Sequence, residues 1–291
     1  MPARTGFTLL DLMITSAILV CIGGYTLLLV DHAQETANRV KCASNLRMIG
    51  QALLLYSNEN RGAFPRTNYD PATADKPVAF TSPQLTEGTD EERAANINPA
   101  YYKGGLKPND VSAALFRLIR REEITAEVFR CPSVQNATTQ PVNPPDVGAL
   151  CNFSDPRQLD YSYANPYPNE NAADAGYKLH NMISAEFAVV ADLNPGVDEL
   201  LTMNTAAVPE DMRKVNSTNH DGDGQNVLYG DGHVEFQNNP FVGMNRDNIY
   251  TYGFSGQTTG GDGIVGSPSN EKDSVLLPTA RTAATTQPTQ K

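Results

Sequence analysis

Residues 6–11 read Gly-Phe-Thr-Leu-Leu-Asp, and an apolar run follows at once from Leu12 to Val30. The run is about 19 residues long, or about 28 Å as a helix, which is enough to cross a bilayer. The leader before it carries Arg4 and has no apolar core, unlike a secretory signal peptide. Asp11 lies at the edge of the run, where a lone carboxylate in lipid costs roughly 2.5–3.5 kcal/mol. The sequence therefore predicts a membrane-spanning helix whose acid needs a partner.

This amino terminus resembles that of type IV pilins and type II secretion pseudopilins. In that family a prepilin peptidase cleaves after the glycine, and the new first residue, usually Phe, is N-methylated. The resemblance implies cleavage between Gly6 and Phe7, methylation of Phe7, and a role for Asp11 in assembly. The family's acid, usually Glu, neutralises the amino terminus of a neighbouring subunit, and Asp11 is one methylene shorter. The alternative is a plain signal anchor in which this short match is accidental.

The helix is predicted to continue past the membrane, because residues 31–58 contain no Pro and one Gly, Gly50. Apolar residues recur there mostly at steps of three and four, as on one face of a helix. They are Ala33, Ala37, Val40, Leu46, Ile49, Leu53 and Tyr56. A stop signal follows at residues 58–62, so we expect one helix of about 50 residues. Its second half should pack on the soluble domain.

Residues 41–50 and 129–133 look like segments of a large pilin-like family from planctomycete-type bacteria. Proteins of that family combine a prepilin amino terminus with a carboxy-terminal motif of His, nine residues and then Asp-Gly. His220 and Asp231-Gly232 match this motif, with ten residues between them in place of nine. Because the extra residue falls in a Gly-rich loop, we expect the hairpin that follows to keep its register.

The soluble part reads as a loop-rich α+β domain. A short amphipathic helix is expected over residues 111–121, and strands over residues 161–163 and 187–192. The clearest hairpin joins residues 226–229 to 233–236 through a Gly-Asp-Gly turn. With the resemblance added, the expected fold is pilin-like: a long amino-terminal helix packed on an antiparallel sheet.

The expected organisation has five parts. They are a leader over residues 1–6, a transmembrane or filament-core helix over 7–30, its amphipathic continuation over 31–61, an extracytoplasmic α+β domain over 62–254, and a disordered Gly-, Thr- and Pro-rich tail over 255–291. Within the domain, residues 62–110 and 135–158 read as long loops. The net charge of −11 and the absence of a basic patch argue against nucleic-acid binding.

Four cysteines occur, at positions 21, 42, 131 and 151. Cys131 and Cys151 flank a Pro-rich stretch, and their pairing would stabilise an exported domain by roughly 3 kcal/mol. We predict this disulfide. Spacing alone leaves a Cys42–Cys131 bond open, and also the reduced state of buried thiols.

The densest polar cluster surrounds the carboxy-terminal motif. Asp221, Asp223 and Asn226, with glycines between them, partly match an oxygen-rich calcium loop, while tight turns around a hairpin are the alternative reading. A zinc site could use His220 and His233 with Asp192 or Asp231 as a third ligand, but this spacing fits no hydrolase signature. The sequence contains no motif for nucleophilic catalysis, and we expect a protein that is not an enzyme and needs no cofactor, apart from the calcium option.

The expected function is structural, as a minor pilin or a pseudopilin. The resemblance implies a prepilin peptidase, other pilin or pseudopilin subunits, an inner-membrane assembly platform and membrane lipid as partners. The protein would span the inner membrane once, with its amino terminus in the cytoplasm and the bulk of the chain periplasmic or extracellular. Two alternatives are a membrane-anchored binding module that does not polymerise and an anchored metal-dependent enzyme.

Overall fold

The computed structural model describes residues 8–81, 106–121, 124–134, 147, 150–253 and 261–280. The predicted cleavage site at Gly6 and Phe7 lies outside these residues. So do residues 82–105 of the first long predicted loop, residues 135–146 and 148–149 of the second, and residues 254–260 and 281–291. The prediction of a disordered tail over residues 255–291 is wrong for residues 261–280, where Leu276–Leu277 form a buried strand of the sheet. The side chains of residue 23 and of residues 25–32, nearly all of them in the predicted membrane span, also lie outside the described part.

The amino-terminal helix is a single element, as predicted. Helix α1 runs from Leu9 to Glu59 over 51 residues. A capping box fixes its start: the Thr8 hydroxyl oxygen accepts the Asp11 N–H at 3.2 Å, and the Asp11 carboxylate accepts the Thr8 N–H at 3.0 Å. The helix ends at the C-cap residue Asn60, inside the predicted stop signal.

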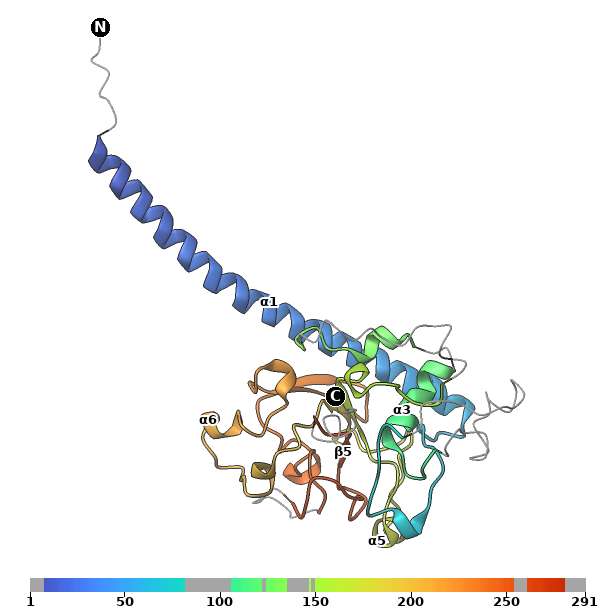
Figure 1. Cartoon of the computed structure of the whole chain (residues 1–291). Helices are drawn as coiled ribbons and strands as arrows, with labels where there is room; N and C mark the ends of the chain where they lie inside the picture. The colour runs from blue at the N-terminus through green and yellow to red at the C-terminus, as the bar shows by residue number, and fades with distance from the viewer. Residues whose placement is uncertain are drawn as a thin grey trace, which may run out of the picture.

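The two halves of α1 have different surroundings. In Figure 1 the amino-terminal half stands away from the rest of the protein, and the carboxy-terminal half lies across the globular head. In the free half, large apolar side chains between Leu9 and Ile22 are more than half exposed. Among the described residues, no helix contains a stretch that is both long enough and apolar enough to cross a membrane.

The face of α1 that packs on the head differs in part from the predicted stripe. Leu46, Ile49, Leu53 and Tyr56 are buried, as expected, and Cys42 joins them on the same face. The prediction is wrong for Ala33, Ala37 and Val40, which are exposed. The face that meets the head at their level instead carries Glu35 and Arg39, because its partners there are polar. The face of α1 that packs on the head therefore runs from Glu35 through Arg39 and Cys42 to Leu46, at steps of four, three and four residues.

The head is built on a five-stranded antiparallel sheet with the order β4-β3-β2-β1-β5. The strands are β1 (Tyr161–Ala164), β2 (Ala188–Asp192), β3 (Gln225–Tyr229), β4 (Val234–Gln237) and β5 (Leu276–Leu277). The predicted hairpin is confirmed, with Leu228 opposite Val234 and the turn made possible by Gly232 at φ 88°. Helix and antiparallel sheet together make this an α+β protein.

Helix α1 lies against β3 and β4 and also contacts α3 (Val111–Arg120), which in turn contacts β1. The helix approaches the sheet closely at Gly50, where a Cβ atom would lie 3.1 Å from the Leu228 side chain. Every residue of β1, β2, β3 and β5 is buried, so the sheet is covered on both faces. Asp192 therefore ends a fully buried strand, β2, and its carboxylate must find partners inside the protein.

Candidate functional site

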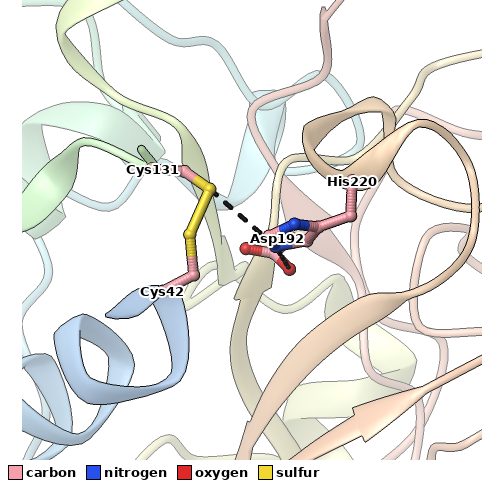
Figure 2. Close-up of side chains that lie close together, drawn as sticks. All are labelled: Cys42, Cys131, Asp192 and His220. Carbon is pink, nitrogen blue, oxygen red and sulfur yellow. Dashed lines mark hydrogen bonds and ion pairs between the residues drawn. A yellow bond between two sulfur atoms is a disulfide. The ribbon is translucent and has the colours of Figure 1, made fainter. Parts of the chain in front are cut away.

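A disulfide fastens α1 to the head. It joins Cys42 on the buried face of α1 to Cys131, which lies two residues after the short helix η3 (Ala126–Phe129). The Cα atoms of the two cysteines are 5.4 Å apart, within the usual range for a disulfide, and the bond spans 89 positions in sequence. Figure 2 shows the bond between the end of one turn of α1 and the chain that passes over it.

The predicted pairing of Cys131 with Cys151 is therefore wrong. Cys151 is a buried thiol that packs with Leu106 and Ala113 in a small apolar cluster apart from the main core. Burial raises the pKa of the Cys151 thiol to about 12. The short loop between Cys131 and Cys151 made their pairing attractive, but the packing of α1 on the sheet places Cys42 next to Cys131.

His220 lies beside this disulfide with its ring completely buried (Figure 2). It ends the short helix η6 (Thr218–His220). Its Nδ1 atom is 2.7 Å from Oε1 of Glu35 on α1 and 3.0 Å from the Ser133 hydroxyl oxygen. Its Nε2 atom is 3.2 Å from Oδ2 of Asp192 and 3.8 Å from Sγ of Cys131. The imidazole thus connects α1, the segment after η3 and the end of β2.

The charges in this site favour a protonated His220. Burial lowers the pKa of His220, but the hydrogen bonds and negative charges of Asp192 and Glu35 raise it by more, so the net shift is upward. For Glu35, burial raises the pKa, and the hydrogen bonds from His220 and Ser133 with the imidazolium charge lower it by more. Both shifts favour the charged forms, with the His220 ring between the carboxylates of Glu35 and Asp192.

Asp192 is held in place by asparagine side chains and by the backbone. Its Oδ2 atom accepts hydrogen bonds from the backbone N–H of Asn226 at 2.6 Å and from the Asn226 amide at 3.2 Å. Its Oδ1 atom accepts from the Asn219 amide at 3.3 Å. These bonds hold the buried carboxylate toward His220 and satisfy most of its acceptor capacity within the protein.

The residues of the predicted calcium loop point to different partners. The Asp223 carboxylate forms ion pairs with Arg39 of α1 and with Arg213, while Asn226 is directed at Asp192. Asp221 is the C-cap residue of η6, with φ 54°, and its carbonyl oxygen accepts from Arg213. Calcium binding remains a prediction, and in this arrangement the loop instead links α1 to the head through charge.

The two parts of the predicted carboxy-terminal motif are in different places. His220 is in the buried site, whereas Asp231 and Gly232 form the exposed turn between β3 and β4. Asp231 accepts the backbone N–H of His233 at 3.0 Å and contacts its ring, which stacks on Tyr229. Of the residues considered for zinc, the structure brings together His220 and Asp192 but places His233 and Asp231 in this turn.

Sequence reasoning missed Glu35 and Ser133. Glu35 lies on the same helix face as Cys42 and Leu46, at helical spacing from them. A search for apolar residues alone does not find it, because Glu35 is charged. No local pattern marks Ser133. Three segments singled out from the sequence do converge here: the second half of α1, residues 129–133 and the stretch after residue 216.

Comparisons of the chain with protein-family models, with curated proteins and with solved structures find no match. The resemblance to pilin-like proteins therefore stays a prediction. The site is a buried cross-link between a long helix and a sheet. One disulfide and a network of charged hydrogen bonds form it. The candidate metal ligands in it, the two cysteines with Asp192 and His220, have ligand atoms that all lie within 4.8 Å of one another.

Proposed function

We propose that this chain is a structural subunit, a minor pilin or pseudopilin, of a type IV pilus or a type II secretion pseudopilus. Its amino-terminal helix would lie first in the inner membrane and then in the core of the filament. Its head would be periplasmic or extracellular. A prepilin peptidase would process the chain, and an inner-membrane assembly platform would extract it from the lipid.

The observation that carries this proposal is the exposed apolar half of α1. Leu9 is 77% exposed, Leu10 is 66% exposed and Ile22 is 55% exposed, on different sides of the helix. A contiguous apolar surface of this kind is unstable in water and marks a site that is covered by lipid or by other proteins. A helix that is apolar all round suits both the lipid phase and a bundle of like helices.

The rest of α1 supports the same proposal. Its head-facing side is fastened by the disulfide and by the core, so a force on the helix would be passed directly to the head. Its outward side still carries apolar residues: Val40 is 64% exposed, Leu54 is 43% exposed and Leu55 is 55% exposed. These residues would extend the helix–helix contact surface beyond the amino-terminal half.

Asp11 has two roles to separate. In the isolated subunit its carboxylate caps α1 by accepting hydrogen bonds from the backbone and the hydroxyl of Thr8. In the proposed filament its charge would also meet the amino terminus of a neighbour, which is created by cleavage before Phe7. A capping carboxylate at the first turn is already aligned with the helix dipole, so its negative charge is stable there until a cation approaches.

Processing is tested by intact-mass analysis of the chain isolated from membranes. The expected mature protein begins at Phe7, with or without a methyl group, and a Gly6→Ala variant should retain the leader. A wild-type chain that still begins at Met1 or Pro2 would contradict the proposal.

Assembly is tested with variants that separate the charge from the cap. Asp11→Asn keeps an oxygen that can accept the Thr8 bonds but removes the charge, and Thr8→Ala weakens the cap but keeps the charge. We expect Asp11→Asn and Asp11→Ala to be cleaved and inserted but not assembled, while Asp11→Glu and Thr8→Ala assemble. Subunit cross-linking and shearing of filaments provide the measurement. Equal assembly of wild type and Asp11→Asn would exclude a required charge pairing.

A second candidate is a membrane-anchored binding module that never polymerises. It is favoured by a cavity of about 770 Å³ beside α1, whose lining includes Arg246, Asn238 and Asn239, together with Arg39 and Arg213, which both pair with Asp223 of the same lining. Guanidinium and amide groups can hydrogen-bond a polar or anionic ligand. Normal cleavage without cross-linked subunits or filaments would favour this function over the first.

A further inference from the structure

The disulfide lies in a set of four metal-ligand atoms. The Sγ atoms of Cys42 and Cys131, a carboxylate oxygen of Asp192 and a ring nitrogen of His220 all lie within 4.8 Å of one another, and all four residues are buried. Figure 2 shows the His220 ring and the Asp192 carboxylate beside the Cys131 sulfur. We infer that the reduced chain binds one Zn²⁺ ion at these four side chains, and that zinc and the disulfide are alternative fastenings of α1.

The distances already present agree with tetrahedral zinc. With Zn–N and Zn–O bonds of about 2.0–2.2 Å, tetrahedral geometry separates nitrogen and oxygen ligands by about 3.4 Å. Nε2 of His220 and Oδ2 of Asp192 are 3.2 Å apart. With a Zn–S bond of about 2.3 Å, sulfur and nitrogen ligands are separated by about 3.6 Å. Sγ of Cys131 and Nε2 of His220 are 3.8 Å apart.

Reduction frees the two sulfur atoms to move apart. Reduction removes the covalent bond, and two thiolates on one zinc ion lie about 3.8 Å apart. The cysteine Cα atoms, 5.4 Å apart, allow this separation through side-chain rotation while α1 and the segment after η3 stay in place. The set of two sulfur atoms, one imidazole and one carboxylate is borderline-soft, as zinc prefers, and a closed four-ligand site is typical of structural zinc.

The surroundings supply the outer contacts that a zinc site needs. A metal-bound histidine usually donates its other ring N–H to a carboxylate, and Nδ1 of His220 is 2.7 Å from Oε1 of Glu35. The ligating carboxylate is itself usually hydrogen-bonded, and Asp192 accepts from Asn226 and Asn219. Two thiolates and Asp192 leave one negative charge on the centre, and Arg39 lies close by in an ion pair with Glu35.

The chemistry balances with a thiol reductant. Two reductant thiols form their own disulfide and transfer two electrons and two protons to the Cys42–Cys131 bond, which becomes two thiols. Zn²⁺ then displaces three protons: one from each thiol and one from Nε2 of the His220 imidazolium, which ligates as a neutral ring and keeps its Nδ1 proton toward Glu35. A newly made chain that has not yet met an oxidant would thus hold α1 on the sheet through zinc. Exchange with a disulfide oxidant reverses the step: the two thiolates form the Cys42–Cys131 bond, the oxidant's own disulfide takes up the two electrons and becomes two thiolates, and Zn²⁺ is released.

The test uses the full chain in detergent micelles, reduced with a phosphine without oxygen and freed of metal. Zinc is added, unbound metal is removed, and the metal content is measured. Alkylation followed by mass mapping shows which cysteines are protected. We expect one zinc per reduced chain, with Cys42 and Cys131 protected only when zinc is present, and no zinc on the oxidised chain. Co²⁺ in place of zinc should give the absorption of a tetrahedral thiolate site.

Variants then define the ligand set. Cys42→Ser and Asp192→Asn should lose or greatly weaken zinc binding. Glu35→Gln should weaken it by roughly 10–100-fold, because it removes the outer carboxylate. His233→Ala, a change to an exposed histidine in the β3–β4 turn, should bind as wild type does. If a variant fails to fold, the protection of cysteines in the wild-type chain still tests the inference. The inference is overturned if the reduced wild-type chain binds no zinc, or if it binds zinc without protecting Cys42 and Cys131.

Discussion

Loss of the Cys42–Cys131 bond should cost this protein a large part of its stability. The bond closes a loop of 89 positions, and closing a loop of n residues removes about 2.1 + 1.5R ln n cal/mol/K of entropy from the unfolded chain. For this loop the stabilisation is about 4.6 kcal/mol at 25 °C. We therefore expect Cys42→Ser to lower the free energy of unfolding by about this amount when a chelator is present.

Urea unfolding of the full chain in detergent micelles measures this change. Buried tyrosines of the head, such as Tyr161 and Tyr163, report on its unfolding by fluorescence, and the chain has no Trp to interfere. With an m value of about 2–3 kcal/mol/M, the midpoint should fall by roughly 1.5–2.3 M. Reduction of the wild-type protein is the matched comparison, because it breaks the same bond without a substitution and should give the same midpoint as Cys42→Ser.

Two results would refute the reasoning. The first is a loss of less than about 1 kcal/mol on both reduction and substitution, since the loop-closure argument leaves no room for so small a value. The second is a further loss when Cys42→Ser itself is reduced. That result would mean that another disulfide, such as the Cys131–Cys151 bond expected from spacing, supports the fold.

Three further predictions concern charge, reactivity and packing. The pKa of Glu35 is lowered from 4.5 and that of His220 is raised from 6.5. Between pH 4.5 and pH 6.5 both groups are therefore charged and form their ion pair. In thermal melts the Tm difference between wild type and Glu35→Gln should be largest there, shrinking as pH falls through the lowered pKa or rises through the raised one. The Cys151 thiol, with its pKa raised to about 12, should resist alkylation until the protein unfolds, as mass mapping can show. Leu46→Ala should cost about 2–5 kcal/mol in urea unfolding, because Leu46 is fully buried, whereas Leu55→Ala, at an exposed position, should change little.

The site itself shows where sequence reasoning reaches its limit. His220 and Asp192 were each recognisable as candidate ligands, but Glu35, which pairs with His220, and Cys42, which lies close to both, belong to α1. The contact between His220 and Glu35 joins residues 185 positions apart. Composition and spacing do not predict a contact between residues so far apart. The calcium hypothesis and the Cys131–Cys151 pairing therefore grouped residues that are near in sequence, and the zinc hypothesis included no residue of α1.

The sequence by itself determined the features that depend on neighbouring residues. The extent of α1, its start at Thr8 and its end near Asn60 follow from capping residues and from the absence of Pro, and the β3–β4 hairpin follows from its Gly-Asp-Gly turn. These signals are local because backbone hydrogen bonds in helices and turns join residues a few positions apart. Only the tertiary structure decided which face of α1 meets the head and which cysteine Cys131 binds. Both depend on how a helix and a sheet, formed by distant parts of the chain, pack to bury polar and apolar groups together.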